Sequence, residues 1–315
     1  MIIAKVIGIF IFVLIGYVST KVGWLPASAS KHLSVIVLHI AAPCMAVTTM
    51  SETELSPEKI TAILMMFLIT IIGLMASMLI GILYNKITRV PAADHGVYIT
   101  AFMFTNNGFM GFAISFTLFG NEGLFLMLMI GCMTVIFLYS LGIVIAKRDA
   151  AAKTGQATKK NSLKNTLKEI INVPIVGAII GLTVFFTQIP IPDFLADILR
   201  SLGSLMTPLA MMVVGMQLTE SNPRNMICNL HTVLTIIMRL ILIPGLFFIV
   251  MSLFNMPDIW LAILTLNFLL PASAVIPSIF EQNGANSVRA AELTFLTTMF
   301  SIATLPVATV LLQML

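Results

Sequence analysis

Charged residues are scarce in this sequence. Only 10% of its 315 residues are Asp, Glu, Lys or Arg, whereas 59% are hydrophobic. A soluble domain typically has about 25% charged and about 45–50% apolar residues. Water cannot solvate this much apolar surface, whereas lipid can. The composition therefore excludes a soluble enzyme and predicts an all-α polytopic membrane protein.

Cysteine and histidine are few and scattered. Cys44, Cys132 and Cys228 lie far apart with no CxxC pair, and the four histidines are equally dispersed. This pattern indicates neither a disulfide framework nor a zinc site, so we expect no metal and no cofactor. There is no Walker motif, so ATP is not the driver. An intramembrane protease would need a Ser-His pair, two facing aspartates or an HExxH motif, and none of these is evident in the sequence. We expect neither an enzyme nor a nucleic-acid partner.

Long apolar segments cover most of the chain. A helix needs about 20 mostly apolar residues to cross the hydrocarbon core of a bilayer. We predict ten transmembrane helices, at residues 2–20, 28–50, 59–84, 95–119, 122–146, 172–189, 194–218, 226–254, 259–281 and 290–314. The first segment is longer than a secretory signal and is followed by no small-residue cleavage site, so we expect it to be retained.

The basic residues are unevenly distributed between the predicted loops. With the N-terminus outside, the inner segments hold most of them, including six lysines in 147–171, and the outer segments keep Lys5, Lys59 and Arg200. Lys and Arg accumulate on the cytoplasmic side of membrane proteins. We therefore predict a multi-pass protein of the cell (inner) membrane with both termini outside. Segment 147–171 becomes a cytoplasmic basic linker, whose later part can form a short surface helix.

The prolines indicate an internal repeat. Pro26, Pro43, Pro57 and Pro91 recur 165 or 166 residues later as Pro192, Pro208, Pro223 and Pro257. The same offset superposes five predicted helices on the other five. Because five is odd, the second half is inverted relative to the first, which is typical of secondary transporters with a site at the repeat interface. We divide the chain into a first repeat, 1–146, the linker, and a second repeat, 172–315.

The fourth and ninth predicted helices are interrupted at matching positions. Asn106, Asn107 and Gly108 interrupt the fourth, and Pro271 interrupts the ninth, 165 residues after Asn106. Asparagines in mid-membrane are costly unless they are paired or line a cavity, and a proline removes a helical hydrogen bond. We predict two broken helices that cross at the centre of the protein. The other interpretation is that these are ordinary kinks, with the asparagines joining neighbouring helices.

The two breaks favour an anion as the ligand. Each half-helix that starts after a break has free N–H groups and the positive end of its dipole, and neither break contains Asp or Glu. A carboxylate would be stabilised there, although carbonyl and amide oxygens could also hold Na⁺. The candidate substrate-binding residues are Asn106, Asn107, Gly108, Pro271, Ala272, Ser273, Ala274 and Val275.

Other residues are candidates for gating, coupling or bending. Arg239 lies near the middle of a predicted helix, so it needs a partner there. This is either a carbonyl or acid of the protein, or the substrate carboxylate. His39 either carries a proton or makes one neutral hydrogen bond. Glu281, with Arg289 and Glu292, forms either a solvated cluster or a gate ion pair. The candidate helix-breaking prolines are Pro43, Pro208 and Pro277.

Several motifs carry a family resemblance. They are Asn107-Gly108-Phe109-Met110-Gly111, Leu118-Phe119-Gly120-Asn121-Glu122-Gly123, Thr207-Pro208-Leu209-Ala210, Pro271-Ala272-Ser273-Ala274 and the ending from Leu296 to Pro306. Nearly end to end, the chain resembles the auxin efflux carrier family, which includes plant PIN-formed carriers and bacterial permeases for malate or malonate. The resemblance implies two inverted five-helix repeats, with broken helices four and nine crossing. It also implies a scaffold of helices one, two, six and seven, often dimeric, and an elevator-like motion.

One feature departs from the plant members of that family. They have an acidic support site in the scaffold, whereas this chain has no carboxylate in the middle of its second or seventh predicted helix. Their coupling scheme is therefore not transferred to this chain. The short central linker favours the compact bacterial type.

Together these features predict a secondary transporter, or permease, for a small organic anion. The substrate would be a mono- or dicarboxylate bound at the crossing of helices four and nine, and transport would proceed by alternating access. The expected partners are the substrate, the lipid bilayer and a second copy of the chain through the scaffold helices, with Na⁺ or H⁺ as the coupling ion. The alternative is a sodium- or proton-coupled cation exchanger on a similar crossed-helix fold. Such exchangers usually place aspartates at the crossing, which this sequence lacks.

Overall fold

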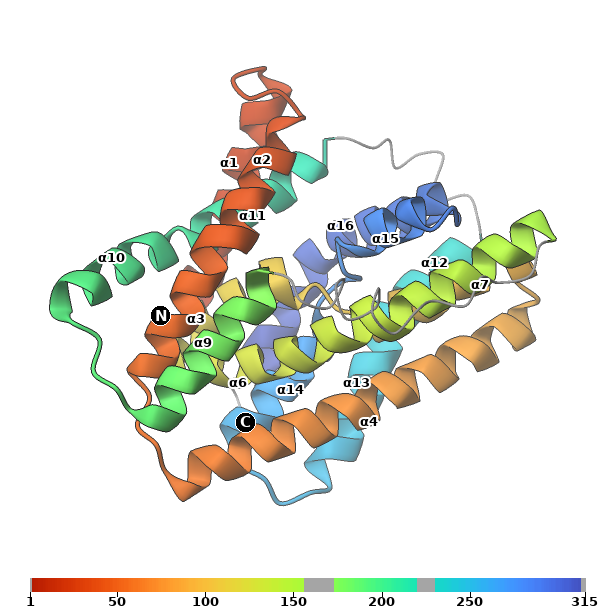
Figure 1. The fold of residues 1–315 in the computed structure, drawn as a ribbon. Helices are drawn as coiled ribbons and strands as arrows, with labels where there is room; N and C mark the ends of the chain where they lie inside the picture. Colours follow the sequence, from red (N-terminus) through yellow and green to blue (C-terminus); the bar gives the residue numbers. More distant parts are fainter. Residues whose placement is uncertain (1, 156–172, 220–229, 313–315) are drawn as a thin grey trace.

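The described part of the chain folds into helices. A computed structural model describes residues 2–155, 173–219 and 230–312 (Figure 1). The first half contains α1 (Ile2–Lys21), α2 (Ala29–Ile36), η1 (Val37–Ala41), α3 (Ala42–Ser51), α4 (Pro57–Thr88), η2 (Ala92–Asp94), α5 (His95–Met103), η3 (Asn107–Gly111), α6 (Phe112–Phe137), η4 (Leu138–Gly142) and α7 (Ile143–Thr154). The second half contains α9 (Val173–Thr187), α10 (Asp193–Ser204), α11 (Met206–Gln217), α12 (Leu230–Ile237), η6 (Met238–Leu242), α13 (Ile243–Ser252), α14 (Asp258–Leu269), α15 (Ile276–Gln282) and α16 (Ser287–Leu312).

Many of these helices are long and apolar enough to cross a membrane. Six continuous helical segments of the described chain meet that criterion, namely Ala29–Ser51, Pro57–Thr88, Asn107–Thr154, Asp193–Gln217, Leu230–Ser252 and Ser287–Val310. Shorter apolar helices lie at Ile7–Lys21, Ile175–Thr187 and Asp258–Leu269. These features confirm the predicted helical membrane protein.

Two prolines follow a widened, π-helical turn. The turn η1 precedes Pro43 in α3, and η6 precedes Pro244 in α13. Proline has no N–H to complete the helical ladder, and a wider turn accommodates the missing hydrogen bond. Both helices continue through the proline. Pro208 lies near the start of α11, in a helical segment that runs from Asp193 to Gln217.

Glycines bring two pairs of helices into close contact. Where α1 packs on α11, a Cβ at Gly16 would clash with the carbonyl of Met212. Where α9 packs on α3, a Cβ at Gly181 would lie 3.3 Å from the carbonyl oxygen of Ala46. Small residues allow such close backbone approach between membrane helices. These contacts join the N-terminal helices to α9 and α11 in the second half.

The helix boundaries differ from the predicted ones near the linker. Helix α7 continues to Thr154, past residue 146, and ends at Gly155, whose φ of 69° is left-handed. Upstream, Gly120 has φ 64° and ψ −153° inside α6, where the fourth and fifth predicted helices meet. Glycine adopts such angles at little cost. The rest of the linker, with its predicted surface helix, lies outside the described residues, as does Pro223.

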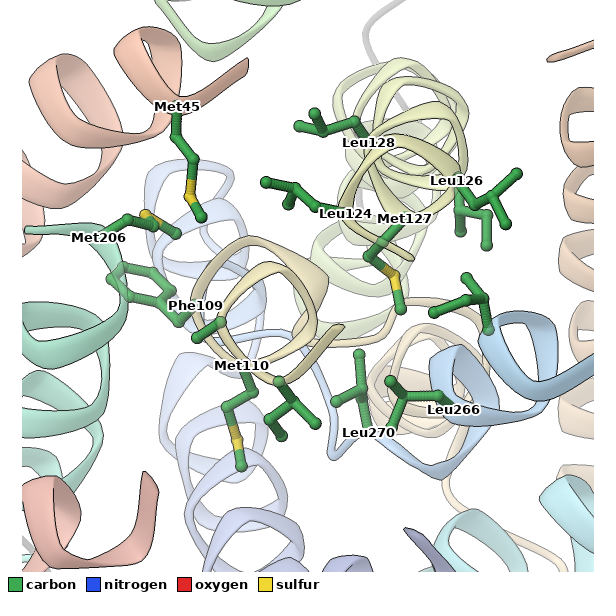
Figure 2. Packing of buried hydrophobic residues seen from close by; sticks show 14 of the residues in the cluster. Met45, Phe109, Met110, Leu124, Leu126, Met127, Leu128, Met206, Leu266 and Leu270 are labelled. Atoms are coloured by element: carbon green, nitrogen blue, oxygen red, sulfur yellow. The ribbon is translucent and has the colours of Figure 1, made fainter. Parts of the chain in front are cut away.

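The hydrophobic core surrounds the first predicted break. Figure 2 shows Phe109 and Met110 of η3 among buried side chains that include Met45 of α3, Met206 of α11 and Leu266 of α14. These elements come from both halves of the chain. The break is therefore in the interior of the protein, where polar groups need partners or a ligand.

Candidate functional site

The two predicted breaks lie against each other. Thr105 and Ala272 form an isolated antiparallel β-bridge. Beside it, the N–H of Asn106 donates to the carbonyl of Pro271 at 2.9 Å. The N–H of Ser273 donates to the carbonyl of Phe104, also at 2.9 Å. Each break thus supplies hydrogen-bond partners for the other.

Local backbone geometry explains this pairing. Helix α5 ends at Phe104, which is extended with φ −103° and ψ 119°. Helix α14 ends at Leu270, which is extended with φ −65° and ψ 148°. Extended backbone in a membrane protein is tolerated only where its polar groups are paired or line a cavity. Two extended segments side by side satisfy part of this requirement.

Three side chains that sequence reasoning missed, those of Thr105, Asn267 and Thr297, support the crossing. The hydroxyl of Thr105 donates to the side-chain oxygen of Asn267 at 2.9 Å, which ties the first break to α14. The N–H of Ala272 donates to the hydroxyl of Thr297 at 3.2 Å, which ties the second break to α16. Polar residues inside apolar segments were the available signal, but their partners could not be read from the sequence.

The second break is satisfied largely by its own surroundings. The hydroxyl of Ser273 accepts a long hydrogen bond of 3.4 Å from the N–H of Val275. The hydroxyl of Thr294 contacts the carbonyl oxygen of Ser273 at 3.5 Å. With the bonds to Phe104 and Thr297, the polar groups of this segment are mostly engaged within the protein.

The first break retains free hydrogen-bonding groups. Asn106 is 3% exposed and Asn107 is 4% exposed, and the side-chain nitrogen of Asn107 is buried with no partner in the described chain. The helical segment that begins at Asn107 also has first-turn N–H groups without intrahelical acceptors. A Cβ at Gly108 would meet only one atom within 4 Å, Leu38 Cδ2 at 3.8 Å. Gly108 therefore leaves open space beside the first break.

That space is a cavity of about 140 Å³. Its lining includes five of the candidate substrate residues, Asn106, Asn107, Gly108, Ser273 and Val275. Most of the remaining wall is apolar, with side chains such as Leu38, Phe112 and Leu128. Its titratable lining residues, within the described ranges, are His39, Cys132 and Tyr139. A cavity of about 150 Å³ can hold a benzene molecule, so the space suits a small ligand with an apolar body.

A larger cavity adjoins the first one. Its volume is about 680 Å³, and it shares Leu38, Phe109, Tyr139 and Val275 with the smaller cavity. Ala274 and Pro277 also line it, and Pro277 is the second residue of α15. It extends to the exposed residues Lys31 and Glu281. Pro271 and Ala272 are buried within the crossing and line neither cavity.

A second group of polar contacts, centred on Glu52 and Glu122, joins α3, α4, α6 and α10. Glu52 after α3 accepts from Arg200 of α10 at 2.8 Å and from the amide of Asn121 in α6 at 2.8 Å. Lys59 of α4 pairs with Glu122 at 2.7 Å. All five residues belong to segments predicted to be outside, whereas Lys31 and Glu281 belong to segments predicted to be inside.

Arg239 binds backbone carbonyls. Its side chain is fully buried, and it donates to the carbonyl of Leu270 at 2.8 Å and to that of Phe102 at 3.4 Å. No carboxylate of the described residues forms an ion pair with it. The sequence left two partners open for Arg239, a group of the protein or the substrate carboxylate. In this structure its partners are carbonyl groups of the protein.

His39 and Glu281 are both exposed. His39 Nδ1 lies 3.2 Å from the carbonyl oxygen of Val35, and the residue lines the smaller cavity. Glu281 makes no ion pair with the described residues. Arg289 instead pairs with Glu292 at 2.7 Å and donates to the Tyr98 hydroxyl at 3.0 Å. Glu281 therefore makes no direct ion pair with Arg289 in the described chain, and a gate ion pair that includes Glu281 is not formed in this structure.

Comparisons with known proteins agree on one family. The membrane transport protein family model matches residues 1–309. An uncharacterized transporter of Methanocaldococcus jannaschii is 30% identical over 215 residues, which cover 67% of each chain. An uncharacterized transporter of Methanothermobacter thermautotrophicus is 25% identical over 218 residues, covering 68% of this chain and 67% of the relative.

Proposed function

Because the chain belongs to the membrane transport protein family, which is the auxin efflux carrier family that its motifs resemble, we propose that it is a secondary transporter for a small monocarboxylate. The substrate has one carboxylate and a compact apolar body, and it binds in the cavity beside the first break. The protein carries it across the membrane without covalent chemistry.

The free side-chain amide of Asn107 is the observation that carries this proposal. Its nitrogen is buried and has no partner in the described chain, although buried donors are nearly always paired. A carboxylate would accept a charge-assisted hydrogen bond from it. The same carboxylate would lie at the start of a long helix, where the dipole favours negative charge. The orphan donor therefore supports the proposal of an anion as the ligand.

The cavity favours a monocarboxylate over a dicarboxylate. Among the described residues, its lining contains no Lys or Arg to balance a second negative charge, and most of its surface is apolar. Burying a second, unpaired carboxylate in such surroundings is strongly unfavourable. The absence of Asp and Glu from this lining also disfavours a bare cation. A short or aromatic monocarboxylate satisfies both the charge and the volume.

The proposed architecture is ten transmembrane helices in two inverted five-helix repeats. The contacts of Gly16 with Met212 and of Gly181 with Ala46 support it. Gly181 lies 165 residues after Gly16, and Met212 lies 166 residues after Ala46, so the same contact occurs twice with the two halves interchanged. The extended residues that end α5 and α14, Phe104 and Leu270, are likewise 166 apart. Such repeats place the substrate at their interface.

Alternating access would use the two ends of the molecule differently. The larger cavity leads from the substrate site toward Lys31 and Glu281, on the proposed cytoplasmic side. The polar contacts around Glu52 tie together segments on the proposed outer side. In this interpretation the structure is an inward-facing state, and opening outward requires the contact between Glu52 and Asn121 to separate. An Na⁺ or H⁺ gradient would drive the cycle.

Uptake by proteoliposomes tests the function. Labelled butyrate, benzoate, malate, malonate and sodium would be offered separately, with and without an imposed sodium or proton gradient. We expect saturable uptake of a monocarboxylate, inhibited by its analogues, with malate and malonate much weaker. Gradient dependence would identify the coupling ion. Sodium flux that is independent of any carboxylate would replace this proposal with a cation exchanger.

A further inference from the structure

Arg239 has an unusual environment for a charged residue. It is fully buried in η6, and none of the ion pairs of the described chain includes it. An unpaired charge inside a membrane protein is costly, and such residues are usually functional. Its two hydrogen-bond acceptors, Phe102 and Leu270, are both carbonyls at the ends of interrupted helices.

The positions of these two acceptors explain how the charge is balanced. Phe102 lies in the last turn of α5, and Leu270 directly follows α14. The C-terminal end of a helix carries roughly half a unit of negative charge. Two such ends that converge on one guanidinium therefore supply about one unit, so no Asp or Glu is needed. Arg239 bridges the two broken helices just before they unwind.

The planar guanidinium is suited to this bridge. Its nitrogen atoms present several N–H donors in a fixed fork, so one side chain can bind two carbonyls from different helices at once. Nη2 takes the carbonyl of Leu270 and Nη1 that of Phe102. Nε is buried without a partner in the described chain. The contact thus spans the two helices whose breaks form the site.

We propose that Arg239 is a positioning residue that joins the carbonyl ends of α5 and α14 and so fixes the crossing on which the ligand site depends. It does not line the cavity, and it acts through the two half-helices. Leu270 is followed directly by Pro271, whose carbonyl accepts from Asn106. Fixing Leu270 therefore fixes the partner of the first break. The effect on transport rests on the proposed function, whereas the effect on the crossing does not.

A distance measurement tests the bridge without any substrate. Spin labels would be attached at Ala92 and Asp258, which are exposed near the starts of α5 and α14, in a background with the native cysteines replaced. We expect Arg239→Gln to broaden the distance distribution between the labels, and Arg239→Lys to fall between Arg239→Gln and the parent protein. Arg148→Gln removes the same charge from an exposed position on α7 and should leave the distribution unchanged.

Ligand binding supplies the second readout. With the monocarboxylate that the parent protein transports, we expect Arg239→Gln to weaken binding about tenfold or more, with partial rescue in Arg239→Lys. A parent-like distance distribution and affinity in Arg239→Gln would overturn the proposal. If Arg239→Gln does not fold, Arg239→Lys takes its place. A parent-like distance distribution and affinity in Arg239→Lys would show that the crossing does not need a guanidinium that binds two carbonyls, and would overturn the proposal. If the parent protein binds no carboxylate, the proposed function fails while the distances still test the bridge.

Discussion

The two breaks at the crossing differ in how their polar groups are satisfied. The second break, around Ala272 and Ser273, gives its hydrogen bonds to Phe104, to the Thr297 hydroxyl and to its own next turn. The first break, around Asn107, keeps a buried amide without a partner. Two segments that occupy matching positions in the sequence thus have different surroundings.

This difference supports different roles for the two breaks. A segment whose polar groups are mostly engaged resists movement and holds its neighbours in place. A segment with an unengaged donor beside an apolar cavity is prepared for a ligand. We therefore assign the ligand contacts mainly to the first break, and the support of the crossing mainly to the second.

Replacing Asn107 by Ala removes the free donor. Because a hydrogen bond to a charged group contributes about 1.5–3 kcal/mol, we expect carboxylate binding to weaken by about tenfold or more and uptake to fall near background. Folding should change little, since the amide nitrogen has no partner in the described protein. Uptake in proteoliposomes and size-exclusion chromatography would measure both. The same change at the exposed Asn255 is the control, and normal uptake by Asn107→Ala would contradict the assignment.

Two glycines of η3 lie in different surroundings, Gly108 beside open space and Gly111 against packed side chains. A Cβ at Gly108 meets only Leu38 at 3.8 Å, whereas a Cβ at Gly111 would lie 2.8 Å from Leu270 Cδ1 and 3.0 Å from Asn107 Cβ. We expect Gly108→Leu to fill the cavity and block uptake, while stability falls by less than about 1 kcal/mol. Gly111→Leu should instead lower stability, because overpacking a core typically costs about 1–3 kcal/mol. Thermal unfolding and uptake of both variants would be compared, and normal uptake by Gly108→Leu would contradict the location of the site.

Thr297→Val tests the support of the second break. The change leaves the N–H of Ala272 without its acceptor, so we expect a loss of about 1–3 kcal/mol of stability. Substrate affinity at a temperature where the variant is folded should change less than threefold. Thr304 is the matched control on the same helix, because its hydroxyl is buried without a partner in the described chain. Thr304→Val should not lower the unfolding temperature, and an equal loss in both variants would count against the role of Thr297.

Ser273→Ala should have the smallest effect. The serine hydroxyl lines the cavity but already accepts a long hydrogen bond from Val275 at 3.4 Å. We expect the KM for the carboxylate to rise by no more than about threefold, because so long a contact belongs at the weak end of the range for a neutral hydrogen bond, about 0.5 kcal/mol. A loss as large as that of Asn107→Ala would show that both breaks bind the substrate equally.

Much of the helical organisation could be predicted from the sequence. Long apolar segments predicted the helices, because a helix needs about 20 mostly apolar residues to cross a bilayer. The polar Asn106 and the helix-breaking Pro271 located the two breaks, which the structure pairs through a direct hydrogen bond. Their chemistry is local, so it can be read from a few adjacent residues.

The partners of buried polar groups could not be predicted. The sequence left Arg239 between a protein partner and the substrate, and the choice depends on where two helix ends converge. The contacts of Thr105 with Asn267 and of Ala272 with Thr297 likewise join residues far apart in the chain. Helix α7 also continues to Thr154, past the predicted membrane span that ends at residue 146. Such features depend on tertiary packing.

A structure with a bound, bromine-labelled monocarboxylate tests the central assignment most directly. The anomalous signal of the bromine would locate the apolar body, and the density would orient the carboxylate. We predict the bromine in the cavity between η3 and α6, with a carboxylate oxygen within hydrogen-bond distance of the Asn107 side-chain nitrogen. A carboxylate held by Ser273 and the second break, with Asn107 still unpartnered, would contradict it.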